Sequence, residues 1–168
     1  MTRVRWMLLG MSLLASPWVA AAPHTHGQGQ ALMALSGQQL TVNLSLPLDV
    51  VLGFERAPRT EKERQALQQA MDQLKQTDAL WQLNSAAKCQ AQPAQVEPPT
   101  WGGAGHADLD VTYTWVCAQP QALDRVEVRL FEPFKRLRRL DLNHALPGGQ
   151  GAQRLTPNKP TWTRKPSP

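Results

Sequence analysis

The sequence predicts an α+β domain, in which one main amphipathic helix packs on a mostly antiparallel sheet that holds one disulfide. Three observations support this fold class. Apolar and polar residues alternate over several short segments, as they do in half-buried strands. One segment instead repeats its apolar residues at helical spacing. The 168 residues contain two cysteines, which are too few for a four-cysteine zinc module but enough for one bridge.

The first predicted elements form a hairpin over residues 31–47. An apolar run, Ala31–Leu35, is followed by a turn at Ser36 and Gly37. The second strand alternates apolar with polar residues, and its apolar positions are Leu40, Val42, Leu44 and Leu46. Pro47 ends this strand. The segment Leu48–Phe54 is predicted to be a mostly apolar connection with a bend at its glycine.

The helix is predicted to begin at Thr60. Thr60 and Glu63 have the spacing of a capping box, in which each side chain accepts a hydrogen bond from the backbone N–H of the other residue. The apolar residues that follow share one helical face, and they are Ala66, Leu67, Ala70, Met71 and Leu74. Lys75 and Gln76 end the helix.

Two strands are predicted next, and each carries one cysteine. Cys89 shares a face with Ala87 and Ala91, and a Pro/Gly-rich loop over residues 93–105 follows. The second strand has the clearest alternation in the chain, and one of its faces is formed by Leu109, Val111, Tyr113, Trp115 and Cys117. A cysteine on this inward face suits a bridge beneath the sheet.

The remaining sequence predicts three more strands. They cover Val126–Leu130, Leu137–His144 and Gln153–Trp162, with a turn at Pro147–Gly151 before the last of them. We expect a single α+β domain over residues 23–156 and a Pro/Lys-rich C-terminal tail over residues 157–168.

Residues 1–22 have the three parts of a secretory signal peptide. Arg3 and Arg5 form a positive start, an apolar run extends to Val19, and Ala20–Ala22 supplies small residues for cleavage. The apolar run is shorter than the roughly 20 residues that cross a bilayer, so we expect no membrane span in the mature protein. An uncleaved anchor is the alternative.

Export changes what the charges and the cysteines indicate. The full chain has 18 Lys+Arg against 13 Asp+Glu, a formal charge of +5, of which Arg3 and Arg5 contribute two. The modest remaining excess and the export signal argue against a nucleic-acid partner. In an oxidising compartment we expect Cys89 and Cys117 to form a structural disulfide, and a pair of free, reactive thiols is the alternative.

Sequence signatures of enzymes are absent. The chain contains no Gly-x-Ser-x-Gly, no His-Glu-x-x-His and no Cys-x-x-Cys motif. Its Gly-Gly-Ala-Gly stretch lies between a proline-rich loop and a strand, which is the wrong context for a nucleotide-binding loop. We therefore expect a protein that is not an enzyme.

Two groups of residues have the chemistry of metal ligands. His24 and His26 stand in a His-x-His pattern near the start of the mature chain, where both imidazoles can reach one ion. His106, Asp108 and Asp110 alternate along a predicted strand and so project from one face. Each group has an ordinary alternative, which is a solvated terminus for the first and a polar strand surface for the second.

A series of short motifs runs in order through the mature chain. They are His24-x-His26-Gly, Leu52-Gly-Phe-Glu-Arg-Ala-Pro58, Ala86-Ala-x-Cys89, His106-Ala-Asp108, Tyr113-x-x-x-Cys117, Leu130-Phe-x-x-Phe134 and Leu155-Thr-Pro-x-x-Pro160. In order and spacing, these motifs resemble the ZrgA-like family of bacterial periplasmic zinc-binding proteins, formerly catalogued as a domain of unknown function. The resemblance covers essentially the whole mature chain.

The resemblance implies an exported, periplasmic protein that binds zinc and assists zinc acquisition or homeostasis, beside a zinc importer. It implies that zinc or a similar divalent metal is the partner, and that Cys89 pairs with Cys117. The metal ligands that it implies are His24, His26, His106 and Asp108, with Glu55 of the Gly-Phe-Glu motif as a further candidate.

Two positions depart from the pattern of the family. Arg56 stands where relatives often have a histidine after Gly-Phe-Glu, and Gln28 stands where they often have a third N-terminal histidine. The loop 93–105 replaces the His-rich insert of many relatives. We therefore expect fewer or weaker zinc sites than in such relatives. The alternative function is a metal-free periplasmic scaffold or interaction module that has lost its zinc ligands.

Overall fold

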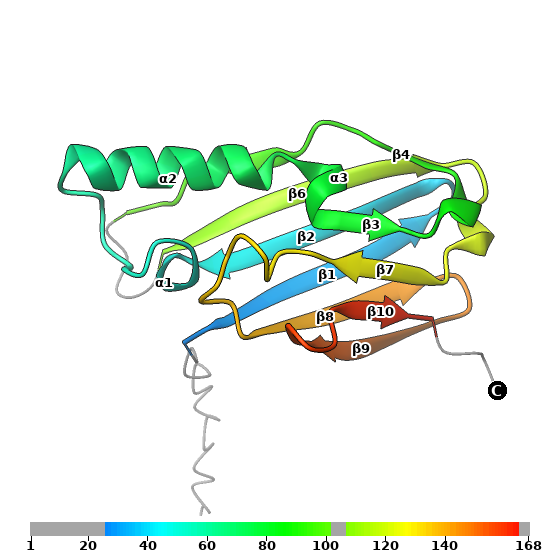
Figure 1. The fold of residues 1–168 in the computed structure, drawn as a ribbon. Helices are drawn as coiled ribbons and strands as arrows, with labels where there is room; N and C mark the ends of the chain where they lie inside the picture. Colours follow the sequence, from blue (N-terminus) through cyan, green and yellow to red (C-terminus); the bar gives the residue numbers. More distant parts are fainter. Residues whose placement is uncertain (1–25, 102–106, 165–168) are drawn as a thin grey trace, which may run out of the picture.

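The alternating segments of the sequence form the strands of two sheets in the computed structural model, which describes residues 26–101 and 107–164 (Figure 1). The larger sheet has seven strands and the smaller sheet has three. The strands of the large sheet are β1 (Gln28–Ser36), β2 (Gln39–Pro47), β4 (Cys89–Ala91), β5 (Gln95–Glu97), β6 (Asp108–Cys117), β8 (Arg139–Leu146) and β9 (Gly149–Leu155). The strands of the small sheet are β3 (Trp81–Leu83), β7 (Arg125–Val128) and β10 (Thr161–Thr163).

β1 lies inside the large sheet, whose strand order is β4-β6-β2-β1-β8-β9, with β5 also paired to β6. The strands of both sheets pair antiparallel, except that β1 and β8 run parallel. The prediction of a mostly antiparallel sheet with one disulfide is therefore confirmed. Because strands predominate and one helix exceeds a single turn, the predicted α+β class is more closely described as predominantly β with one main helix.

α2 (Glu61–Leu74) is this main helix, and it begins where the capping-box spacing predicts. The Glu63 backbone N–H donates to Thr60 Oγ1 at 3.2 Å, and the Thr60 backbone N–H donates to Glu63 Oε2 at 3.2 Å. α1 (Leu48–Val51) and α3 (Thr77–Leu80) are single turns. In the described part of the chain, no helix has both the length and the hydrophobicity that crossing a membrane requires.

The core lies between the large sheet and a layer formed by α2, α3 and the small sheet (Figure 1). The inward face of β6 is buried as the alternation predicts. On this face, the Tyr113 ring lies 5.6 Å from the ring of Trp81 in β3 and 6.1 Å from that of Trp115, centroid to centroid. Tyr113 Oη donates to the Leu74 carbonyl oxygen at 2.9 Å. This bond ties the C-terminal end of α2 to β6.

Cys89 and Cys117 form the predicted disulfide, with an S–S distance of 2.04 Å. The two residues lie directly opposite each other in β4 and β6. β4 is an edge strand of three residues, so the covalent bond supplements a short ladder of hydrogen bonds. On the chain-entropy account, a bridge across 28 residues restricts the unfolded chain by roughly 3–4 kcal/mol.

Three segments differ from the sequence prediction. Leu48–Val51 forms the helical turn α1 instead of an irregular connection, because the backbone N–H groups that follow it donate to its carbonyl oxygens. Gln95–Glu97, inside the predicted Pro/Gly loop, pairs with β6 as β5. Residues 77–83 form α3 and β3, although their sequence predicts no element. All three segments are short, so tertiary contacts rather than local periodicity decide their conformation.

The last predicted strand, Gln153–Trp162, is in fact two strands that belong to different sheets. β9 ends at Leu155, and Thr156 and Lys159 then close a turn through backbone hydrogen bonds of 2.9 and 3.1 Å. β10 follows and pairs with β7. Thr161–Thr163 fall within the predicted tail, yet they complete the small sheet, and the Trp162 side chain is fully buried.

His144 contacts this buried tryptophan from the facing strand β8. The Trp162 indole N–H donates to His144 Nδ1 at 3.3 Å, and the two rings meet edge to face with centroids 5.3 Å apart. Gly151 of β9 is paired with His144 of β8. A Cβ at Gly151 would lie 2.9 Å from the His144 ring, so the glycine leaves room for the imidazole. Because Nδ1 accepts the indole proton, this contact requires a neutral imidazole. Burial, and then the charge of Arg164, lower the pKa of His144.

We expect this contact to make the folded protein less stable in mild acid. The pKa of His144 is lower in the folded than in the unfolded chain, so the unfolded chain binds the proton first as the pH falls below about 6.5. Urea denaturation at about pH 7 and about pH 5 measures the effect, with His144→Gln as a control that cannot titrate.

The wild-type protein should lose more free energy of unfolding over this range than the His144→Gln variant. The carboxylates with lowered pKa values, Glu63 and Asp72, stay ionised in this window and do not contribute. His26, whose pKa is raised, contributes equally to both proteins. Equal losses in the two proteins would contradict the role given to His144.

Candidate metal site

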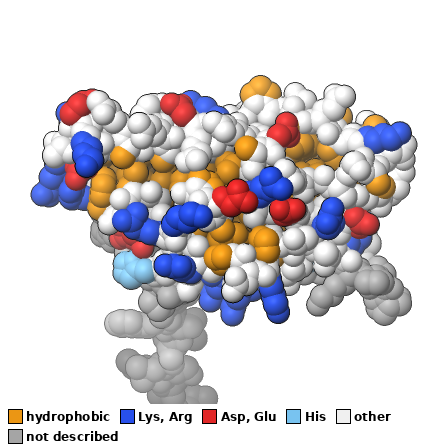
Figure 2. Space-filling view, viewed as in Figure 1, with side chains coloured by type: hydrophobic (Ala, Val, Ile, Leu, Met, Phe, Trp, Pro, Cys, Tyr) orange, Lys and Arg blue, Asp and Glu red, His pale blue; other side chains and the backbone are white. Residues whose placement is uncertain are grey.

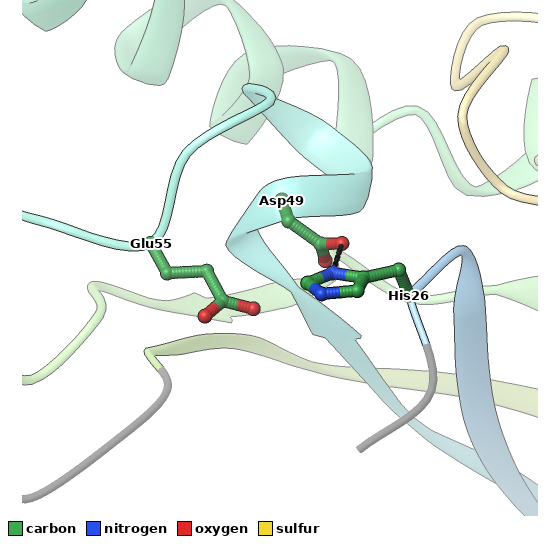
Figure 3. Close-up of side chains that lie close together, drawn as sticks. All are labelled: His26, Asp49 and Glu55. Carbon is green, nitrogen blue, oxygen red and sulfur yellow. Dashed lines mark hydrogen bonds and ion pairs between the residues drawn. The ribbon is translucent and has the colours of Figure 1, made fainter.

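The structure brings three residues with metal-ligating side chains together at one end of the large sheet (Figure 3). They are His26, just before β1, Asp49 of α1, and Glu55 in the segment after α1. Each offers one ligand atom, and these atoms all lie within 4.8 Å of one another. We call these three residues the metal cluster. In Figure 3 the imidazole lies between the two carboxylates.

The local fold explains how residues far apart in sequence meet here. Gly27 has a positive φ of 79°, which favours glycine, and it turns the chain from His26 into β1. β2 leads directly into α1, and the Leu48 N–H donates to the Ala107 carbonyl oxygen at 2.9 Å, which holds α1 beside the start of β6. Gly53, with a φ of 85°, then ends α1 and redirects the chain toward Glu55.

His26 and Asp49 are already hydrogen-bonded to each other. His26 Nδ1 lies 2.7 Å from Asp49 Oδ2. The His26 side chain is 82% exposed, whereas that of Asp49 is 17% exposed. The hydrogen bond to Asp49, its charge and that of Glu55 raise the pKa of His26. A bound metal must therefore displace a proton that these carboxylates stabilise.

Asp49 has a second oxygen whose surroundings favour a cation. Its Oδ1 is buried and makes no hydrogen bond to the described residues. A buried carboxylate oxygen without a partner is destabilising, and a bound cation would relieve that cost. When Nδ1–H donates to Asp49, the neutral imidazole keeps its Nε2 lone pair free for a metal. Carboxylates that orient a metal-binding histidine in this way are a recurrent feature of zinc sites.

The residues present therefore fit a divalent metal of borderline character. An imidazole and carboxylates are the ligand types that zinc accepts, and here one of the carboxylates, Asp49, orients the imidazole. The cluster lies at the surface, where an ion can arrive and leave. This arrangement suits exchangeable binding better than a closed structural site.

The structure unites some of the ligands predicted from the sequence and not others. His26 and Glu55 belong to the metal cluster. Asp108 is the first residue of β6 and lies opposite Pro47, and within the described residues it is not part of the cluster. The predicted ligands His24 and His106 lie outside the described residues.

The sequence does not predict Asp49 as a ligand. It is a single carboxylate in an apolar segment, Leu48–Phe54, and no neighbour in the sequence suggests a ligand there. Its partner His26 is 23 positions away. No sequence signal marks it, because the turn of α1 that carries it is itself not predicted from the sequence.

Arg56, which follows Glu55, points to α2 and not to a metal. Its guanidinium donates to both carboxylate oxygens of Glu63, at 2.7 and 3.1 Å, and lies 4.8 Å from the centroid of the Phe54 ring. Glu63 also accepts from the backbone N–H of Arg59 at 2.7 Å. The Arg56 bonds and those backbone bonds lower the pKa of Glu63 to about 2. Arg56 thus anchors the segment after Glu55 to the start of α2.

A comparison with protein families gives one match. A family described as "ZrgA family zinc uptake protein" matches residues 23–164, most of the chain. A search of curated proteins finds no match to the chain. The matched range begins before the first described residue and ends with the last one, so it includes both sheets, the disulfide and the metal cluster.

Proposed function

Because this chain belongs to the ZrgA family of zinc uptake proteins, we propose that it is an exported, periplasmic protein that binds zinc and assists its acquisition beside a zinc importer. In this proposal zinc is cargo, and the protein is not an enzyme. The metal cluster is the observation that carries the proposal, because it gathers an imidazole and two carboxylates at an open surface.

Each residue of the cluster has a separate part in the proposed binding. His26 supplies the nitrogen ligand through Nε2, and Glu55 supplies an oxygen ligand from the opposite side of the imidazole. Asp49 fixes the imidazole through Oδ2, so that Nε2 faces the cation. All three are held by backbone of the folded domain, so the ion would meet a largely preformed site.

His24 and His106 are proposed as additional ligands on the basis of chain connectivity. His24 is two residues from His26, a separation that the chain spans in at most about 7 Å. His106 precedes Ala107, whose carbonyl oxygen accepts from the Leu48 N–H beside Asp49. Each of the two histidines is therefore close in sequence to a described residue at or beside the metal cluster, and substitution to alanine tests each of them.

Export to the periplasm is supported by the N-terminal sequence and by the disulfide. Residues 1–22 have the composition of a cleaved signal peptide. The bond between Cys89 and Cys117 belongs to a compartment where disulfides persist. N-terminal sequencing of the protein recovered from the periplasm tests this part of the proposal, with cleavage expected close to Ala22.

Calorimetric titration of the mature protein with zinc at neutral pH tests the binding itself. We expect one main site with a dissociation constant below about 10 μM, together with a higher melting temperature in excess zinc. A ligand that binds only the folded state at 100 times its dissociation constant adds about 2.7 kcal/mol of stability.

The alternative of a metal-free scaffold predicts neither result. Absence of binding tighter than about 10 μM, with an unchanged melting temperature, would replace the zinc proposal with that alternative. The His24→Ala and His106→Ala variants, titrated in parallel, measure whether these two residues add to the affinity.

A further inference from the structure

One face of the large sheet is left uncovered by the helices and strands that the structure describes. α2, α3 and the small sheet pack on the other face, where they enclose the core (Figure 1). Alternate residues of each strand point to the uncovered face, such as Gln30, Leu32 and Ala34 of β1, whereas Ala31 and Met33 between them are buried. We call this surface the open face. Water commonly meets one face of an antiparallel sheet, so the composition of the open face is what carries information.

The strand register arranges the side chains of the open face in rows that cross the sheet. In one row, Leu32 of β1 lies between Asn143 of β8 and Asn43 of β2, and Thr112 of β6 follows. In the next row toward the β1–β2 turn, the same four strands contribute small residues, which are Ala145, Ala34, Thr41 and Thr114. A third row follows at the turn itself. We call these three rows the uncharged rows.

No strand of the described sheet places a charged side chain in the uncharged rows. The charged residues of the open face, among them Asp110 and Asp141, lie in rows at the opposite end of the strands. Figure 2 shows the other side of the molecule, where acidic and basic side chains are interspersed, as is usual for a soluble surface. Among the described residues three large hydrophobic side chains are exposed, and two of them, Leu32 and Val116, lie in the uncharged rows.

The chemistry of the uncharged rows favours a second copy of this chain as their partner. Amide and hydroxyl groups, such as those of Asn43, Asn143 and Thr112, both donate and accept hydrogen bonds, so the same surface can pair with itself. The chain has a net positive charge, and two copies repel each other least through a surface without charges. An acidic protein or an anionic membrane would instead be attracted to exposed Lys and Arg side chains, which these rows lack.

The uncharged rows are large enough for a weak interface. Strands lie about 4.8 Å apart and alternate residues about 6.8 Å apart, so three rows across the strands from β9 to β6 cover roughly 500 Å². Two copies would bury roughly 1,000 Å² in total, near the lower limit for specific association. A hollow of about 290 Å³, lined in part by Leu32, Asn43 and Asn143, gives room for side chains of the second copy. The charged rows would form the polar rim that such interfaces have.

We propose that the mature protein forms a weak, symmetric dimer, in which the uncharged rows of the open face pack against the same rows of a second copy. The metal cluster lies at the other end of the strands, where β1 begins and β2 ends. Each copy therefore keeps its metal cluster accessible in the dimer. The contact needs no bound zinc, so this inference goes beyond the proposed function and does not depend on it.

Sedimentation velocity of the mature protein, at concentrations from about 1 to 500 μM, tests the dimer. We expect a concentration-dependent change from monomer to dimer with a dissociation constant of about 1–100 μM, as the small interface implies. Leu32→Arg places an unpaired charge within the contact and should raise this constant at least about tenfold. Gln82→Arg is the matched control, because Gln82 is an exposed residue of β3 in the small sheet, and it should leave the dimer unchanged.

Each outcome decides for or against the open face. A protein that stays monomeric over the whole range would overturn the inference. A dimer that persists in Leu32→Arg, or one that Gln82→Arg weakens equally, would also overturn it, because the contact would then lie elsewhere. Circular dichroism checks that the variants are folded, and Ala145→Arg, in the next uncharged row, replaces Leu32→Arg if that variant does not fold. Leu32→Arg should bind zinc like the wild type, so failure of the proposed function would be a separate result.

Discussion

Replacing His26 with alanine is expected to weaken zinc binding by about 100-fold, the largest change that a single substitution in the metal cluster should cause. His26 supplies the one nitrogen ligand of the cluster, and it is already oriented by its 2.7 Å contact with Asp49. Its loss leaves two carboxylates, which bind zinc weakly without an imidazole. Calorimetric titration with zinc at neutral pH measures the change.

The control for this prediction is a second histidine outside the cluster. His144→Gln removes an imidazole that contacts Trp162 and should leave the zinc affinity unchanged. The wild-type affinity should also fall as the medium is made more acidic, because Asp49 and Glu55 raise the pKa of His26 and the proton competes with the metal. An affinity in His26→Ala within about threefold of the wild type would show that His26 is not the main ligand.

Replacing Trp162 with alanine is expected to lower the free energy of unfolding by about 3–5 kcal/mol. The side chain is fully buried between the two sheets, so its removal leaves a large cavity. The substitution also removes the indole N–H that donates to His144. In addition, Trp162 is the central residue of β10, where it pairs with Val126 of β7. A loss of this size is a large part of the total free energy of unfolding of a typical domain, which is about 5–15 kcal/mol.

Urea denaturation of Trp162→Ala beside Trp101→Ala provides a matched comparison. Trp101 is 37% exposed, so its replacement should cost less than about 1 kcal/mol. The test also decides how the C-terminal residues contribute, because β10 lies within the range that the sequence predicts to be a tail. A loss below about 1 kcal/mol in Trp162→Ala would show that β10 is dispensable for the fold.

Long, regular segments could be predicted from the sequence. The alternation through β2 and β6 identifies both strands and their buried faces, and the Thr60–Glu63 spacing places the start of α2. The disulfide also follows from cysteines on two predicted strands. These patterns are local or depend on a single pair of residues. The elements that they indicate can therefore be predicted without a structure.

The small sheet and its place in the fold could not be predicted in the same way. β3 and β10 have three residues each, too few for a period of two to stand out. Trp81 and Trp162 are buried because the two strands lie on either side of β7, and no local pattern reveals that order. The parallel pairing of β1 with β8 likewise depends on segments that are far apart in the sequence.

Only part of the metal cluster could be predicted from the sequence, for a related reason. His26 and Glu55 belong to motifs that resemble those of a zinc-binding family, whereas Asp49 lies in an apolar segment with no such motif. The turn of α1, which follows β2, brings its carboxylate to the imidazole.

The parallel pairing of β1 with β8 has a consequence for the order in which the protein can mature. Gln28 pairs with Arg139, about 110 residues later, and the intervening chain must be closed into a loop before this ladder forms. Synthesis begins at the N-terminus, so His26 emerges from the ribosome long before β8. The hydrogen bonds from Arg138 and Arg139 to Gly27 can form only when β8 has docked. A tightly held zinc ion would therefore mark a molecule whose C-terminal part has already emerged and folded.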